Sequence, residues 1–181
     1  MALKPVIYKL TLNLSDLNRH CYQDFQLTIA LHPSETLERM VARIVAFALN
    51  AHDELTFTKG LSSVDEPDIW QKTLDGQTAL WIEVGEPADD RIKKATRIAQ
   101  RVKVYSFNSK SAVWWQQEQG KFSNLVADII QFDDQHIQAL TKHVSRTMTW
   151  YVTISDNSVT VNSEQGENEV SWRVLQGQAL Q

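Results

Sequence analysis

The chain has 181 residues, of which 43% are hydrophobic, and its net charge is −4. This length and apolar content predict a single domain over residues 1–181 with a sizeable core. An acidic chain does not coat nucleic acid by charge alone, so any nucleic-acid contact must rest on a local patch. A single cysteine, Cys21, excludes an internal disulfide, and no apolar stretch is long enough for a signal peptide or a membrane span. We therefore predict a cytoplasmic protein without membrane contact.

The first third of the chain predicts a hairpin followed by a helix. Residues 6–14 and 22–31 alternate apolar and polar side chains, as two paired strands do. Residues 32–53 repeat apolar side chains at helical spacing, with Ser34 placed to cap the start and Asn50 near the end. Residues 55–61 follow as a short strand that ends at a glycine.

The middle of the chain predicts a strand, a helix and another strand. Residues 62–77 are acidic and rich in turn signals. Residues 78–84 are apolar almost throughout, which is typical of a strand covered on both faces. Residues 86–102 predict a helix with Pro87 in its first turn, and residues 103–108 a further strand. This order of elements predicts an α/β fold with a central mixed sheet.

The last third predicts a short helix over 111–119, a strand over 124–132 and a helix over 133–144. The short helix carries Trp114 and Trp115; we expect one in the core and the other on a loop or stacked on a ligand. Residues 146–175 alternate like strands joined at turns, and we expect them to add to the same domain beside the N-terminal hairpin.

Acidic side chains near the end of the strand over 78–84 suggest a metal site. Ligands of open α/β sheets bind outside the carboxyl ends of strands, which is where Glu83 lies. Asp65 or Asp68 could complete a pair of oxygen ligands suited to Mg²⁺. A cation from the next helix could then steady phosphate charge, and the candidates are Arg91, Lys93 and Lys94.

Seven stretches, taken together and in order, resemble the YaeQ family of bacterial proteins. They are "HPSETLERM", "FTKGL", "DEPDIW", "WIEVGEPADDRIKKA", "SFNS", "WW" and "RTMT". The resemblance runs nearly end to end and implies a variant of the PD-(D/E)XK nuclease fold. That fold is a restriction-endonuclease-like mixed sheet flanked by helices, here with an extra N-terminal hairpin and extra C-terminal strands.

The resemblance also implies a divalent-metal site, for Mg²⁺ or Mn²⁺. Within it Glu83 looks like the acid of the Glu-x-Lys strand, and the Val84 carbonyl like a further metal ligand. Asp65 looks like the partner aspartate, with Asp68 as the alternative, and Glu38 like the assisting helix glutamate. Where the motif has a lysine this chain has Gly85, so a lysine from the following helix, Lys94 or Lys93, would have to activate the water. Arg91 and Arg97 of the same helix are expected to hold phosphate.

Two functions from different classes follow from this resemblance. The first is a metal-dependent nuclease that hydrolyses nucleic-acid phosphodiesters. The alternative is a catalytically degenerate nuclease-like protein that binds nucleic acid or protein as a regulatory module, since a fold does not fix a function. A lysine or arginine head group placed between the two carboxylates distinguishes these hypotheses.

Overall fold

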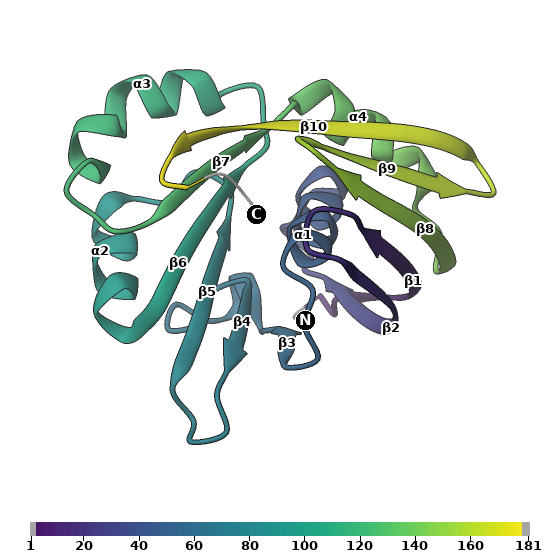
Figure 1. Cartoon of the computed structure of the whole chain (residues 1–181), viewed down its shortest axis with the longest axis horizontal. Helices are drawn as coiled ribbons and strands as arrows, with labels where there is room; N and C mark the ends of the chain where they lie inside the picture. The colour runs from purple at the N-terminus through teal and green to yellow at the C-terminus, as the bar shows by residue number, and fades with distance from the viewer. Residues whose placement is uncertain (1–2, 179–181) are drawn as a thin grey trace.

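The computed structural model describes residues 3–178, which form a curved mixed sheet with helices on both of its faces (Figure 1). The strands are β1 (Val6–Asp16), β2 (Cys21–Leu31), β3 (Leu55–Phe57), β4 (Ile69–Lys72), β5 (Thr78–Val84), β6 (Ala99–Ser106), β7 (Asp128–Phe132), β8 (Thr147–Ser155), β9 (Ser158–Ser163) and β10 (Gly166–Gln176). The helices are α1 (Leu37–Leu49), α2 (Asp89–Ile98), α3 (Ser111–Phe122) and α4 (Asp134–Leu140), with short 3₁₀ turns η1 (Gly60–Ser62) and η2 (Thr141–His143).

The ten strands lie in the order β2-β1-β8-β9-β10-β7-β6-β5-β4-β3. Parallel pairing occurs between β1 and β8 and along β5, β6 and β7, and the other pairs are antiparallel. The long strand β10 pairs with β9 through its first half and with β7 through its second half, so it joins the two halves of the sheet. These pairings confirm a mixed sheet and the expected contact between the C-terminal strands and the N-terminal hairpin.

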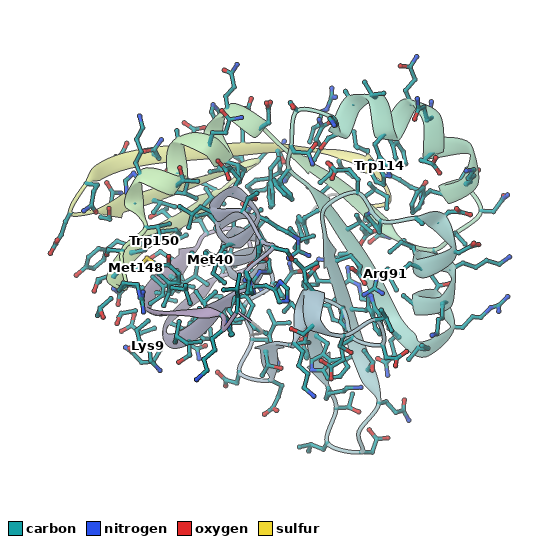
Figure 2. All side chains as sticks on the ribbon, turned by 180° about the vertical axis from the view of Figure 1, so that it is seen from behind. Lys9, Met40, Arg91, Trp114, Met148 and Trp150 are labelled. Carbon is teal, nitrogen blue, oxygen red and sulfur yellow. The ribbon has the colours of Figure 1, made fainter. Side chains whose placement is uncertain are left out.

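The sheet curls into an arch, almost a barrel, around α1 (Figure 1). Helices that are apolar all round are normally enclosed, and residues 40–49 of α1 are all buried. Met40 of α1 belongs to the same inner core as Met148 and Trp150 of β8 (Figure 2). The arch explains why α1 tolerates so few polar side chains, and it makes the buried Arg43 an exception that needs a partner.

A second core covers the outer face of β5, β6 and β7, against which α2 and α3 pack (Figure 1). Both faces of β5 are therefore covered, as its almost unbroken apolar run predicted. The other half of the sheet has one solvated face, and β8 accordingly alternates buried and exposed residues. Within residues 3–178 no helix is long and apolar enough to cross a bilayer.

Several element predictions need correction. Thr36 caps α1 in place of Ser34, since the Thr36 hydroxyl accepts a hydrogen bond from the Arg39 N–H. Strand β4 lies in the segment interpreted as turns. Helix α2 ends at Ile98, because the chain pairs with β5 as strand β6 from Ala99 onward. Trp114 and Trp115 do not separate: both pack, half-buried, in the outer core, where their rings lie 5.5 and 6.0 Å from that of Phe122.

Candidate functional site

The carboxyl end of β5 brings together the predicted strand acid and an aspartate. Strand β4 pairs with β5 so that Ile69 lies opposite Ile82, which places Asp68 beside the end of β5. The Val84 N–H donates to Asp68 Oδ2 at 2.8 Å, and the Asp68 N–H donates to the Ile82 carbonyl at 3.0 Å. Asp68 and Glu83 are both buried. The register of this hairpin therefore makes Asp68 the neighbour of the strand end.

Glu83 points to the outer face of the sheet, the side covered by α2. Its Oε1 accepts two hydrogen bonds, from Trp81 Nε1 at 2.9 Å and from Arg91 Nε at 2.7 Å. The guanidinium of Arg91 also donates to the carbonyls of Val64 and Glu66 at 2.8 and 2.7 Å. Figure 2 shows Arg91 reaching from α2 toward the strands. Arg91 thus binds the strand acid and fastens the loop before β4 at the same time.

The pKa of Glu83 is raised from 4.5 to about 7, chiefly by burial and secondly by the negative charge of Asp68. Arg91 and the Trp81 hydrogen bond act in the opposite direction, but they do not outweigh burial. The contribution of Asp68 indicates that the two carboxylates lie close enough to repel each other. Paired carboxylates of this kind are typical of functional sites, and also of structural ion-pair networks.

Arg39 of α1 holds the other carboxylate. Its Nη2 donates to Asp68 Oδ1 at 2.6 Å and to the Val84 carbonyl at 3.2 Å, while its Nη1 donates to Glu35 at 2.5 Å. Arg43 holds Glu35 from the other side with bonds of 2.9 and 2.6 Å. Burial would lower the pKa of Arg39, but the charges of Asp68 and Glu35 prevail and raise it. Arg39 is therefore a fixed cation.

The position of Arg39 decides whether these residues fit a divalent metal. A metal shared by Asp68 and Val84 would bind the same carboxylate and carbonyl oxygens that Arg39 Nη2 contacts. The remaining Asp68 oxygen accepts from the Val84 N–H, and the hydrogen bonds to Glu83 fall on Oε1. Among residues 3–178 no group of three or more Asp, Glu, His or Cys side chains could hold a metal. In this arrangement the residues do not fit a metal, because the Arg39 guanidinium contacts the oxygens that would have to bind it.

The other residues singled out in the sequence lie outside this arrangement. Asp65 is exposed, and its nearest cation is the exposed Lys94, whose Nζ lies 3.7 Å from the carboxylate. Lys93 and Arg97 also point into solvent on α2. Glu38 lies in the first turn of α1, half-buried, where its charge suits the helix N-terminus. The geometry therefore favours Asp68 over Asp65 as the partner of Glu83, and Arg39 over either lysine as the nearby cation.

Gly85, where the predicted Glu-x-Lys motif would have a lysine, adopts a backbone conformation that suits glycine. Its φ is +123°, a region that L side chains rarely occupy. Its N–H donates to the Tyr105 carbonyl at 2.8 Å, which holds the turn in place at the end of β5. A lysine at this position would strain the backbone even though space exists for its Cβ.

Replacing Gly85 by lysine should therefore lower the free energy of unfolding by about 1–3 kcal/mol. The same substitution at Gly120, a glycine in α3 with open space and no positive φ, is the matched control and should be neutral or slightly stabilising. Urea denaturation of the two variants measures the difference. Equal stability of both variants would contradict the strain assigned to position 85.

Sequence reasoning missed Arg39, Arg43 and Glu35, which together hold Asp68 in place. The available signal was Arg43, a charged residue inside the apolar run of α1, which had to find a buried partner. It also missed Lys103 of β6, a charged residue in a buried strand. Both signals are charges at positions where the periodicity of the element demands an apolar side chain.

Comparison with known proteins places the chain in a family. The model of the family described as YaeQ protein matches residues 1–172. The "Uncharacterized protein YaeQ" of Escherichia coli (strain K12) is 41% identical over 180 residues, covering 97% of this chain and 98% of that protein. Its namesake from Salmonella typhi is also 41% identical with the same coverage.

Two crystal structures of YaeQ proteins have the same fold. The protein from Pseudomonas syringae matches with a TM-score of 0.92 at 38% identity, over 96% of this chain and 97% of that one. The protein from Xanthomonas axonopodis pv. citri matches with a TM-score of 0.92 at 33% identity, over 96% and 99% of the two chains. With a family model and full-length relatives in agreement, this chain belongs to the YaeQ family.

Proposed function

We propose that the protein is a non-hydrolytic nucleic-acid-binding module on a restriction-endonuclease-like scaffold, in which Arg39 replaces the catalytic metal. One observation carries this proposal: Arg39 Nη2 lies 2.6 Å from Asp68 Oδ1 and 3.2 Å from the Val84 carbonyl. These are two of the groups that a nuclease of the resembling superfamily would offer to its metal. A guanidinium there satisfies the carboxylate but provides no activated water.

Three further features support the loss of hydrolysis. The second carboxylate, Glu83, is bound by Arg91. Glycine replaces the motif lysine at a position whose φ of +123° disfavours any side chain. The lysines of α2, Lys93 and Lys94, are exposed, and Lys94 lies beside Asp65. Each group that would activate or place a water is therefore absent from the strand end or engaged elsewhere in this arrangement.

The exposed cations of α2 provide the surface for the phosphate backbone. Lys93, Lys94 and Arg97 all lie on the solvent side of a helix that follows directly on the strand bearing Glu83. Cations clustered on one helix attract a polyanion even when the whole chain is acidic, because salt screens the repulsion from acidic side chains that lie far away. These cations form the local basic patch that a chain with a net charge of −4 requires to bind nucleic acid.

The second candidate function is a metal-dependent nuclease. It is favoured by the closeness of the two carboxylates, since the charge of Asp68 contributes to the raised pKa of Glu83. Like charges held together are costly without a cation, and a divalent metal would supply that cation and position a water. This function requires Arg39 and Arg91 to leave both carboxylates before the metal binds.

Binding and cleavage assays separate the two functions. They use labelled single- and double-stranded DNA and RNA, with Mg²⁺ and with Mn²⁺. We expect salt-sensitive binding without cleavage, and weaker binding when Lys93, Lys94 and Arg97 are replaced by glutamine. The matched control removes three exposed cations elsewhere, Lys4, Lys142 and Arg173. Cleavage that disappears in Glu83→Gln would establish the nuclease, and equal binding by the two triple variants would refute the α2 surface.

A further inference from the structure

A second polar site lies at the opposite end of α1 from Arg39. It is a pocket of about 510 Å³ between the C-terminal end of α1 and strands β4, β5, β6 and β7. Its apolar lining includes Leu49 and Leu80, and its charged lining consists of Arg19, Arg101, Lys103 and Asp128. Pockets of this volume with a few convergent polar groups commonly bind small molecules. We call it the Lys103 pocket.

Lys103 is built into this pocket by the strand that carries it. Side chains alternate along β6, so Val102 and Val104 enter the outer core while Lys103 and Tyr105 face the inside of the arch. Lys103 is only 6% exposed. Its Nζ donates to Asn50 Oδ1 at 2.7 Å, and Asn50 Nδ2 donates to Tyr105 Oη at 2.7 Å. This chain of hydrogen bonds fixes where the ammonium group points.

The ammonium group of Lys103 has donors to spare. A lysine carries three N–H donors, and Asn50 accepts one of them. None of the ion pairs between residues 3 and 178 includes Lys103. A buried cation without a counter-charge is costly unless another group supplies the charge. This imbalance points to an anionic ligand.

The surrounding charges strengthen the positive potential. Arg19 is held by Asp16 and by the Ala48 and Ala51 carbonyls at the end of α1, so it stays in place. Arg101 is largely exposed at the rim, 3.6 Å from Asp128. The pKa of Lys103 is lowered to about 8, chiefly by burial and secondly by the charge of Arg101, while Asp128 acts in the opposite direction. Because Asp16 balances Arg19, the remaining charged lining of Arg101, Lys103 and Asp128 has a net charge of +1.

We propose that the Lys103 pocket binds a phosphomonoester, with Lys103 and Arg101 as the ligands of the phosphate group. The lining is positively charged, and an arginine fork with a lysine point charge is suited to phosphate. Leu49 and Leu80 contact the carbon skeleton of the ligand. The site does not depend on the proposed nucleic-acid surface, because its lining includes none of the α2 cations Lys93, Lys94 and Arg97.

Calorimetric titration with inorganic phosphate and with glycerol 3-phosphate tests the proposal. We expect the wild type to bind both probes, and Lys103→Met and Arg101→Gln each to weaken binding by about tenfold or more. Lys142→Met, which removes an exposed lysine outside both the pocket and the α2 surface, is the control and should bind like the wild type. Arg101 is exposed, so Arg101→Gln keeps the test valid if Lys103→Met affects folding.

The same titration with sulfate at several pH values gives an independent readout, because sulfate stays dianionic. Affinity should fall as pH rises through about 8, when Lys103 loses its proton, and this fall should be absent in Lys103→Met. His52, Arg19, Arg101 and Asp128 also line the pocket, and they are present in both proteins. Oligonucleotides with and without a 5′-phosphate distinguish a small ligand from a nucleic-acid end. Undetectable binding at millimolar phosphate, or equal binding by Lys103→Met, would overturn the proposal.

Discussion

Replacing Arg39 by methionine should lower the free energy of unfolding by about 3–5 kcal/mol, because it leaves buried carboxylates without their cation. Asp68 loses its only ion pair among the described residues, and Glu35 keeps Arg43 alone. Methionine retains much of the packing of the arginine stem, so the loss reports mainly on charge. Denaturant unfolding at neutral pH measures the effect.

The control and a double variant sharpen this prediction. Arg97→Met removes an exposed arginine from α2 and should change stability by no more than about 0.5 kcal/mol. Asp68→Asn in the Arg39→Met background should recover part of the loss, since it removes the unpaired charge. A loss from Arg39→Met as small as that from Arg97→Met would show that the buried ion pair does not form.

The second large effect concerns the pH dependence that Glu83 introduces. The pKa of Glu83 rises from 4.5 to about 7 on folding, so the folded state binds the proton more tightly than the unfolded chain. Its contribution to stability is therefore fully present below about pH 4.5 and is lost as pH rises through about 7. Over that pH window the free energy of unfolding of wild type should fall by about 3 kcal/mol relative to that of Glu83→Gln, because glutamine does not titrate.

Chemical denaturation of both proteins between mildly acidic and mildly basic pH measures this difference. Glutamine keeps an oxygen that accepts hydrogen bonds from Trp81 and Arg91, so the packing around the strand end is preserved. Glu164→Gln, at an exposed position, is the control and should follow the wild-type curve at every pH. A Glu83→Gln curve parallel to wild type would mean that the carboxylate titrates normally and is not buried as described.

Local periodicity was enough to predict most elements of the fold. The alternation of residues 6–14 and 146–175 and the apolar run of 78–84 each correspond to strands of the structure. Strand β4 is not predicted from the sequence, because it has only four residues and lies within a turn-rich segment. Its pairing with β5 defines it more than its own composition does. The helix predicted over residues 86–102 extends past the end of α2, because the alanine and valine residues there suit either a helix or the start of β6.

The candidate site was predictable only in part. The position of Glu83 at a strand end followed from the sequence pattern, but the choice between Asp65 and Asp68 depends on the register of the hairpin formed by β4 and β5. Arg39 approaches Asp68 across a long stretch of chain, from a helix at the centre of the arch. No local pattern encodes such a contact, so the pairing of Arg39 with Asp68 emerges only from the fold.

The position of Arg39 is tested most directly by calorimetric titration of wild type with Mg²⁺ and Mn²⁺, next to Arg39→Met and Glu83→Gln. If a guanidinium takes the place of the metal, wild type binds neither ion at millimolar concentrations. Arg39→Met then gains binding, because the Asp68 carboxylate and the Val84 carbonyl become free. Metal binding by wild type that is lost in Glu83→Gln would contradict this account and identify a working metal centre.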